Sequence, residues 1–406
     1  EEAQEKKGKS QRFIERFGRR YSPAALLAAV LLAVVPMALG LGAATWLHRA
    51  VVFLVAAAPC ALVISVPITL VAAIGTAGRR GILIKGGVHL EELAKVRVVA
   101  LDKTGTLTVG RPEVTEVVTF EGYDEGRLLA EAAALEARSQ HPLARAILAR
   151  AKVAGVEATP ADDFQSMTGL GAQGTVAGRR LYVGSPKFFT ELGTPIGAAP
   201  AHIKRLQEAG NTVVLFGTKE ALHGLVAIAD PLRREAAEAV AALKRAGIAR
   251  VVMLTGDNAR AANAIGTKAG VDEVFADLSP EDKTKRVAEL RERYGEVAMV
   301  GDGVNDAPAL AAASVGIAMG AAGTDVALET ADVALMTDDL MRLPYLVTFS
   351  RRTWGVIQQN LVLSIVVIAV LSLGAVGGLF ALPIAVLAHE LSELLVISNG
   401  LRMLRS

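Results

Sequence analysis

The 406-residue sequence has a single cysteine, Cys60, so no disulfide can form within the chain and a disulfide-stabilised scaffold is excluded. Aromatic residues are few, and a formal net charge of +2 is too small to indicate a nucleic-acid partner. The first twenty residues are charged and lack the apolar core of a secretory signal. The mean hydropathy is nevertheless positive, at +0.40, which predicts membrane spans beside soluble domains.

Long uncharged runs predict four membrane-spanning helices. They cover 24–47, 50–78 and 355–388, and the last is too long for one helix. A turn at 381–383 gives a third span to about 380 and a fourth from about 384 to 401. The pair His48-Arg49 interrupts the first two runs and predicts a tight turn there. A buried hairpin in a soluble core is the alternative for any single run, but it does not account for all of them. We therefore expect two spans within 23–80 and two within 355–402.

The charges beside these runs predict the orientation of the spans. Basic residues flank the ends on one side: Arg19, Arg20, Arg79, Arg80, Lys85, Arg351, Arg352, Arg402 and Arg405. The positive-inside rule places all these ends in the cytoplasm, and an even number of spans agrees with it. Residues 1–22 are then a cytoplasmic lead-in, and about 88–345 form the soluble part.

Within the soluble part, short β-branched runs alternate with helical segments. Runs at 96–101, 251–254 and 297–300 read as buried strands, and 234–245 and 280–292 read as helices. This alternation predicts a doubly wound parallel α/β sheet. About 150 residues separate the first strand from the second, too many for one crossover. We therefore expect a second domain, at 116–226, inserted between the sheet segments 88–115 and 227–345.

The first of these strands delivers a carboxylate, Asp102, onto a tight turn that contains Lys103 and Thr104. The carboxyl ends of strands are where open α/β sheets bind ligands. A carboxylate in this place can act as nucleophile toward a phosphoryl group and form an aspartyl-phosphate. Taken alone, an Asp at this position could instead cap the turn.

The turns after the other strands supply matching groups. Thr255 and Gly256, followed by Asp257, offer a hydroxyl and a backbone N–H to phosphoryl oxygens. Lys283 gives the positive charge that a loose phosphoryl transition state requires. Asp302 and Asp306, four residues apart on one turn, supply hard oxygens for Mg²⁺.

Four motifs occur in the order typical of one family. They are Asp-Lys-Thr-Gly-Thr at 102–106, Thr-Gly-Asp at 255–257, Pro-Glu-Asp-Lys at 280–283 and Gly-Asp-Gly-Val-Asn-Asp at 301–306. The set resembles the P-type ATPases, which use the haloacid-dehalogenase-like fold, and Asp-Pro-Leu-Arg at 230–233 resembles their hinge segment. The resemblance implies that ATP phosphorylates Asp102, with Mg²⁺ held by Asp102, Thr104, Asp302 and Asp306. Related phosphatases carry a second Asp where this chain has Thr104, and losing that base favours a persistent phosphoenzyme.

The predicted insert carries a second resemblance. Glu136 and the sequence Ser-Gln-His-Pro at 139–142 resemble the adenine-binding motif of the heavy-metal branch of P-type ATPases. The resemblance implies that Glu136 and His141 bind ATP. Three glycines, Gly169, Gly171 and Gly174, permit close backbone approach to a nucleotide, although the Gly-x-Gly-x-x-Gly pattern is a weak signal by itself.

A transport site is expected in the membrane. Cys60 follows Pro59 in the middle of the second predicted span, and a proline opens the helix where transporters bind ions. His389 and Glu390, with Glu393 one turn further, are ionisable residues in the fourth span and are functional candidates. Cys60, His389 and Glu390 form a mixed S/N/O set, which favours Zn²⁺, Co²⁺, Cd²⁺ or Ni²⁺ over Cu⁺. The alternatives are a structural proline kink with an inert thiol, and a water-filled vestibule around His389.

The Pro-Cys and His-Glu pairs are similar to those of the cobalt/zinc group of heavy-metal P-type ATPases. The chain departs from that group at Ala58, where Ser is usual, and in the sequence Leu-Ser-Glu at 391–393. It has no Thr-Gly-Glu loop of an actuator domain, so we expect the later part of a pump, with 1–22 as the linker out of that domain. The expected function is ATP-driven export of a divalent transition metal by a monomeric pump of the plasma membrane. A Cu⁺ pump, a membrane-anchored phosphatase and a non-catalytic regulatory fragment remain as alternatives.

Overall fold

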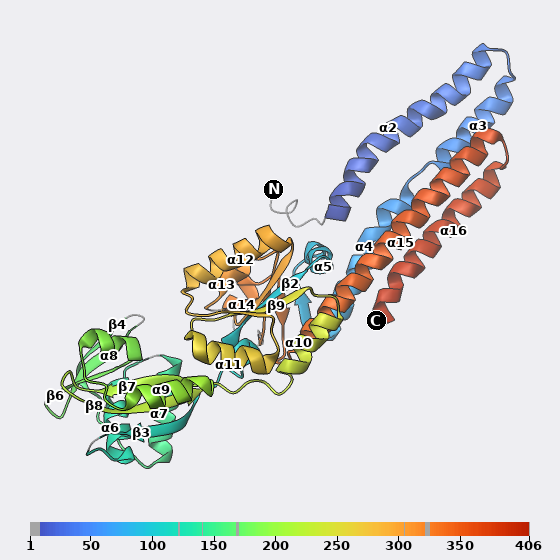
Figure 1. Cartoon of the computed structure of the whole chain (residues 1–406). Helices are drawn as coiled ribbons and strands as arrows, with labels where there is room; N and C mark the ends of the chain where they lie inside the picture. The colour runs from blue at the N-terminus through green and yellow to red at the C-terminus, as the bar shows by residue number, and fades with distance from the viewer. Residues whose placement is uncertain are drawn as a thin grey trace. The chain divides into compact units, whose positions relative to one another are not determined.

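The structure is a computed structural model that describes residues 9–120, 122–139, 141–167, 170–303, 305–320 and 325–405. The chain divides into two compact units. Figure 1 labels the helices and strands of both. One unit combines 1–96 with 314–406, and the other is Arg97–Ala313. Each unit is described by itself below.

Long apolar helices make up most of the first unit: α2 (Lys9–Ala38), α3 (Ala43–Ala56), α4 (Cys60–Arg79), α15 (Arg342–Gly377) and α16 (Leu382–Leu401). Among the described residues, four stretches are long and apolar enough to cross a membrane: Arg16–Ala38, Ala43–Arg79, Arg342–Gly377 and Leu382–Arg405. Many of their large apolar side chains are exposed, as lipid-facing residues are. The prediction of four spans is confirmed at this level of length and composition.

The turn between the first two spans differs from the prediction. The helix breaks after Ala38, where Gly40 and Gly42 have φ values of 76° and 87°, a conformation that favours glycine. The predicted turn at His48-Arg49 is wrong, because both residues lie inside α3. Arg49 is accommodated there, since its Nη1 donates to the Val376 carbonyl at 3.2 Å and its guanidinium lies over the Trp46 ring. The second span is instead interrupted at 57–59, immediately before Cys60, where the sequence predicts that Pro59 opens the helix.

The rest of the first unit is a small α/β segment. It contains β1 (Ile82–Ile84), α5 (Gly87–Leu93), β12 (Val315–Ala318), α14 (Asp325–Thr330) and β13 (Val333–Leu335). β13 pairs antiparallel with β1 and parallel with β12. In chain order, α4 is followed by β1, and β13 is followed by α15. The pairing of β1 with β13 thus joins the chain just after α4 to the chain just before α15.

The second unit contains four parallel strands in the order β11 (Val297–Gly301), β2 (Val98–Asp102), β9 (Arg250–Leu254) and β10 (Glu273–Phe275). The helices between them are α10 (Ala236–Arg245), α11 (Ala259–Ala269), α12 (Pro280–Tyr294) and α13 (Ala307–Ala312). β2 and β11 are buried along their whole length, which explains their continuous apolar sequences. The predicted doubly wound α/β fold is confirmed.

The segment between β2 and β9 forms an antiparallel sheet. Its order is β3 (Glu113–Thr119), β8 (Leu222–Ala229), β7 (Thr212–Gly217), β6 (Arg179–Gly184), β5 (Gly171–Val176) and β4 (Asp162–Met167). Four helices accompany it: α6 (Glu125–Glu136), α7 (Pro142–Val153), α8 (Pro186–Leu192) and α9 (Ala199–Glu208). The sheet thus extends slightly beyond the limits of 116–226 expected for the insert.

Both faces of this antiparallel sheet are covered. Side chains on neighbouring positions of β7 alternate: Val214 packs in a core with Leu128 and Ile147, whereas Val213 packs in another core with Phe189 and Leu206. This alternation is the period of two expected for a strand buried on both faces. Helices α6 and α7 therefore cover one face, and α8 and α9 the other.

Candidate functional site

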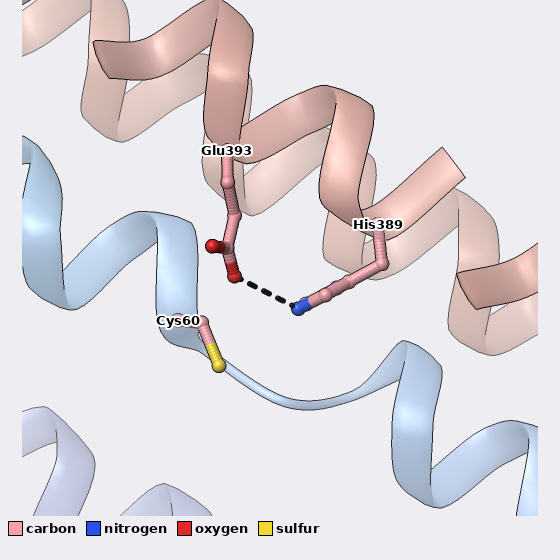
Figure 2. Close-up of side chains that lie close together, drawn as sticks. All are labelled: Cys60, His389 and Glu393. Atoms are coloured by element: carbon pink, nitrogen blue, oxygen red, sulfur yellow. Dashed lines mark ion pairs between the residues drawn. The ribbon is translucent and has the colours of Figure 1, made fainter. Parts of the chain in front are cut away.

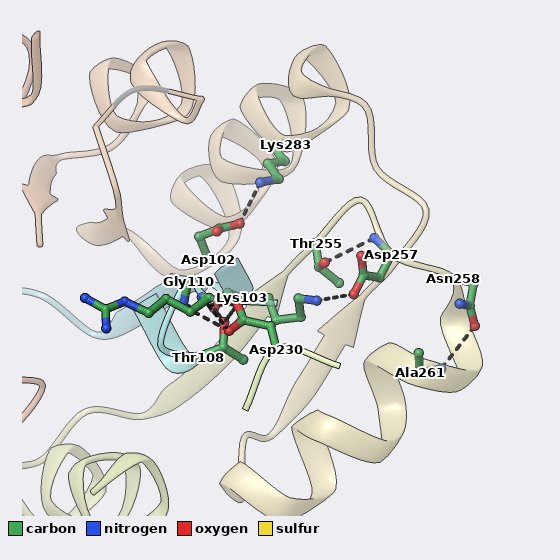
Figure 3. A network of polar contacts seen from close by, with 11 residues as sticks. Asp102, Lys103, Thr108, Gly110, Asp230, Thr255, Asp257, Asn258, Ala261 and Lys283 are labelled. Atoms are coloured by element: carbon green, nitrogen blue, oxygen red, sulfur yellow. Dashed lines mark hydrogen bonds and ion pairs between the residues drawn. The ribbon is translucent and has the colours of Figure 1, made fainter. Parts of the chain in front are cut away.

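Asp102 lies at the carboxyl end of the central strand β2. Its neighbours at that edge are Leu254, with which it is in register, and the end of β11 at Gly301. The turns that follow β9 and β11 therefore begin beside Asp102, as the carboxyl ends of parallel strands require. The Asp102 residue is only 4% exposed. Figure 3 shows its carboxylate directed toward the start of α12.

Lys283 reaches Asp102 from the first turn of α12. Ser279 and Asp282 form a capping box that fixes the beginning of this helix. The Lys283 Nζ donates to Asp102 Oδ1 at 2.6 Å and to Asp306 Oδ1 at 2.7 Å. Burial lowers the pKa of Lys283, but the two carboxylates outweigh it and raise the pKa overall, so the side chain stays a cation beside Asp102.

Burial is the main reason that the pKa of Asp102 is raised, to about 7. The nearby carboxylates of Asp306 and Asp302 raise it further, and Lys283 lowers it. A buried carboxylate held between other acids and one cation carries excess negative charge. A further cation at this edge of the sheet would relieve that excess.

The arrangement of the acids fits Mg²⁺. Asp306 is 1% exposed, and its Oδ2 is buried without a hydrogen-bond partner among the described residues. Asp302 lies on the same turn, where its carboxylate accepts hydrogen bonds from the backbone N–H and the side-chain amide of Asn305. Oxygen atoms from carboxylates at one edge are the ligands that Mg²⁺ takes in phosphoryl-transfer sites. Thr104, also expected at this site, is exposed on the turn after Asp102.

The turn after β9 brings Thr255, Gly256 and Asp257 to the same edge. The buried Thr255 hydroxyl accepts from the Asp257 backbone N–H at 3.1 Å, which closes the turn. The Asp257 carboxylate forms an ion pair with Lys103, which follows Asp102. Both contacts are visible in Figure 3. Lys103 is thus directed to the Thr-Gly-Asp turn, and among the described residues its side chain pairs with Asp257 and not with Asp102.

A second polar network joins the two segments that connect the sheets. The Asp230 carboxylate accepts hydrogen bonds from Thr108 Oγ1 at 2.5 Å and from the backbone N–H groups of Gly110 and Arg111 at 3.0 Å (Figure 3). Arg233 donates to the carbonyls of Thr106 and Gly105 at 2.9 and 3.1 Å. The family resemblance implied a hinge segment at 230–233. It did not indicate that Asp230 binds the segment at 108–111, which leads from β2 to β3.

The residues expected to bind nucleotide lie near the end of α6 and the start of α7. Glu136 is buried, and its burial raises the pKa of its carboxyl. His141 is the N-cap of α7, where its Nδ1 accepts from the Leu143 N–H at 3.3 Å, and it is exposed. The expected functions of both residues remain predictions.

The glycines differ from the expectation of a loop. Gly169 lies outside the described residues, whereas Gly171 and Gly174 are part of strand β5. A Cβ atom on Gly171 would lie 2.0 Å from the Val183 carbonyl oxygen, and one on Gly174 would lie 2.9 Å from the Ala161 Cβ. These two glycines are therefore required for packing of the sheet, whatever they contribute to nucleotide binding.

A second cluster lies between α4 and α16. Ligand atoms of Cys60, His389 and Glu393 lie within 4.8 Å of one another. His389 is buried, and its Nε2 is 3.3 Å from Glu393 Oε1. Figure 2 shows the three side chains converging beside the break that precedes α4. The set offers sulfur, nitrogen and oxygen, which is suited to a divalent transition metal.

Glu390, expected as the third ligand, does not belong to this group and is exposed. Glu393 takes its place, because residues four apart on a helix lie on the same face and residues one apart do not. The spacing of His389 and Glu393 carried this signal in the sequence. The resemblance to the His-Glu pair directed the expectation to Glu390 instead.

Comparisons with known proteins agree with this geometry. A family model described as a haloacid dehalogenase-like hydrolase matches residues 96–314. A probable cadmium-transporting ATPase of Alkalihalophilus pseudofirmus is 46% identical over the whole chain, which covers 57% of that protein. A cadmium-transporting ATPase of Staphylococcus aureus is 44% identical over the whole chain, which covers 56% of it. The chain therefore spans somewhat more than half the length of these relatives.

A solved structure is similar over the whole chain as well. It is the crystal structure of a zinc-transporting PIB-type ATPase in an E2.Pi state, with a TM-score of 0.77 and 42% identity. The match covers all of this chain and 66% of that protein. At this identity the likeness extends to the sequence as well as to the fold.

Proposed function

The chain belongs to the haloacid dehalogenase-like hydrolase family, and from this premise we propose that it works as an ATP-driven pump for a divalent transition-metal ion. The observation that supports this most is the presence of two sites in one chain. Asp102 lies between Lys283 and two acids at a sheet edge, and Cys60 lies with His389 and Glu393 on candidate membrane helices. Phosphatase activity does not require the cluster of Cys60, His389 and Glu393.

In the proposed reaction, a carboxylate oxygen of Asp102 attacks the γ-phosphorus of ATP. The new O–P bond forms as the bond to the β-γ bridging oxygen breaks, and ADP leaves. In this proposal Lys283 neutralises charge on the phosphoryl group, and the Thr255 hydroxyl and Gly256 N–H bind its oxygens. Mg²⁺, when bound, would neutralise phosphate charge, with Asp102, Asp302, Asp306 and Thr104 as the residues that hold it.

The exported ion would be bound by the thiolate of Cys60, the imidazole of His389 and the carboxylate of Glu393. Thiolate and carboxylate together carry two negative charges, which a divalent ion neutralises and a monovalent ion does not. We therefore propose Zn²⁺, Cd²⁺, Co²⁺ or Ni²⁺ as the substrate class and Cu⁺ as the less suited ion. The relatives named for cadmium and the neighbour named for zinc support this class. Export across the plasma membrane, by a monomer, belongs to the same proposal.

Labelling of the protein from γ-labelled ATP tests the phosphorylation step. We expect an acid-stable phosphoenzyme that depends on Mg²⁺ and disappears in Asp102→Asn. Label that survives this substitution would exclude Asp102 as the nucleophile. Hydrolysis of small phosphate esters without any metal-stimulated ATPase activity would favour the membrane-anchored phosphatase instead.

Matched substitutions at the ion site test the transport step. Cys60→Ala and Glu393→Gln should each raise the metal concentration for half-maximal stimulation by about tenfold or more, because each removes one ligand. Glu390→Gln is the control on the same helix and should change it little. If Glu390→Gln is the more damaging of the two glutamate variants, the ligand set is wrong. The same measurement across a panel of ions distinguishes a divalent pump from a Cu⁺ pump.

A further inference from the structure

Asn360 is a fully buried amide in α15, a helix long and apolar enough to cross a membrane. An amide offers two N–H donors and an oxygen acceptor, and burying them is costly unless they are paired. Inside a membrane bundle no bulk water is present to pair them. The hydrogen-bond partners of Asn360 therefore indicate which helices this buried amide holds together.

These partners come from two other helices. The Asn360 Nδ2 donates to Thr69 Oγ1 of α4 at 3.4 Å and to the Val396 carbonyl of α16 at 3.3 Å. Its Oδ1 accepts from Asn399 Nδ2, also in α16, at 2.8 Å. Arg402 Nη1 in turn donates to Asn399 Oδ1 at 2.7 Å. One side chain of α15 thus binds both α4 and α16.

The same two helices carry the ion ligands. Thr69 follows Cys60 in α4, and Val396 follows Glu393 by a single helical turn in α16. Thr69 is fully buried, and its hydroxyl also donates to the Ser65 carbonyl at 2.7 Å. A Cβ atom on Gly400 would lie 2.9 Å from Thr69 Oγ1, so α4 and α16 are in close contact at this level. The amide network therefore joins the helices on either side of the ion cluster.

α4 and α15 are also the helices that lead toward the soluble part of the chain. α4 continues into β1 and α15 follows β13, and these strands pair through Ile82 and Leu335. Arg342, the first residue of α15, donates from Nη1 to the Arg80 carbonyl at 2.8 Å. α16, which carries His389 and Glu393, contacts Asn360 of α15 through Val396 and Asn399. It is therefore joined to a helix that begins directly after this strand pair.

We propose that Asn360 is a positioning residue that couples ion occupancy at Cys60, His389 and Glu393 to phosphorylation of Asp102. Movement of α16 against α4 on ion binding must break or re-form the Asn360 hydrogen bonds, so α15 follows the state of the ion site. The inference rests on the proposed function. It adds a residue that contacts neither the ion nor the phosphate.

The test is Asn360→Leu in membranes that contain the protein. Leucine has the same branching as asparagine and no hydrogen-bonding atoms. We measure phosphoenzyme formation from ATP at increasing Cd²⁺ concentration. The factor by which Cd²⁺ stimulates it should fall at least about fivefold, which is the low end of typical coupling between sites. The amount of Cd²⁺ bound at equilibrium should stay as in the unmodified protein. A purely structural function would reduce both quantities together.

Ser364→Ala is the matched control. Ser364 lies one turn from Asn360 in α15, is 1% exposed, and its Oγ has no hydrogen-bond partner in the part of the chain that the structure describes. Its removal should leave Cd²⁺-stimulated phosphorylation unchanged. Thr69→Val and Asn399→Ala each remove one partner of Asn360 and should give smaller losses in the same direction. These two variants decide the question if Asn360→Leu does not fold.

Two results would overturn this inference and leave the proposed function intact. One is full Cd²⁺ stimulation in Asn360→Leu, and the other is a loss of Cd²⁺ binding that parallels the loss of phosphorylation. An unmodified protein that is never labelled at Asp102 would instead overturn the proposed function, and this inference with it. The two failures are distinguishable because the first requires a labelled unmodified protein.

Discussion

The Lys283 Nζ lies 2.6 Å from Asp102 Oδ1, although 181 positions of sequence separate the two residues. The contact depends on two independent features of the fold. β2 is the strand that ends at Asp102, and the capping box at Ser279 and Asp282 orients the first turn of α12. Asp102 and Lys283 are therefore brought together by the parallel sheet, and by no local sequence relationship.

Replacing this cation should slow phosphorylation without abolishing ATP binding. In Lys283→Met we expect phosphoenzyme formation to fall by about 100-fold, as when one charge-stabilising group is removed from a phosphoryl or acyl transfer site. Rapid-quench labelling from ATP measures the rate. Lys285→Met is the control, because Lys285 is on the same helix with a side chain 71% exposed. Equal rates in the two variants would contradict an electrostatic function for Lys283.

The pKa of Asp102 predicts a pH dependence at low Mg²⁺. Burial and Asp306 raise the pKa to about 7, and the carboxylate, not the acid, is the nucleophile. Between pH 8 and pH 6 the protonated fraction rises from about one tenth to about nine tenths, so the labelling rate should fall by about tenfold. Raising the Mg²⁺ concentration should shift the midpoint to lower pH, because a cation stabilises the carboxylate. A midpoint that does not respond to Mg²⁺ would contradict a shared site.

Much of the catalytic edge could be predicted from sequence because every part of it is local. Each buried strand reads as a short apolar run, and each polar motif follows its strand directly, as at Asp102, Thr255 and Asp302. Parallel pairing then places the motifs at one edge. Hydropathy likewise predicts the four spans, since it depends on composition alone.

Other features depend on tertiary contacts that no local pattern contains. Arg49 stays inside α3 and does not mark the first membrane turn, because its guanidinium donates to the Val376 carbonyl of α15. Whether Glu390 or Glu393 faces Cys60 depends on the rotation of α16, which packing against α4 decides. The three-helix contact of Asn360 is of the same kind.

Glycine at 171 should be required by packing of the antiparallel sheet that contains β5. In Gly171→Ala the new methyl group meets the backbone of Val183, which belongs to the neighbouring strand and cannot move aside as a flexible side chain can. We expect the free energy of unfolding of this domain to fall by about 1–3 kcal/mol, measured by denaturant titration. Gly178→Asn is the control, because Gly178 has φ +75° with open space around it and Asn tolerates that conformation. If Gly171→Ala weakens ATP binding with unchanged stability, the glycine acts on the nucleotide directly.

Asp230 should control the rate of phosphorylation through the connection between the two sheets. Asp230→Ala leaves the Thr108 hydroxyl and the N–H groups of Gly110 and Arg111 without their acceptor, so the connecting segments lose their mutual order. We expect the affinity for ATP to change less than twofold, since Glu136 and His141, the residues proposed to bind the nucleotide, are not part of this network. The rate of phosphoenzyme formation should fall by about tenfold or more, because a misplaced phosphoryl group reacts slowly. Equilibrium nucleotide binding and rapid-quench labelling separate the two quantities. Glu220→Ala serves as the control, because Glu220 is an exposed acid on the β7–β8 hairpin.

Parallel losses of affinity and rate would show that Asp230 supports nucleotide binding itself. An unchanged rate would show that the connection between the sheets needs no fixed geometry.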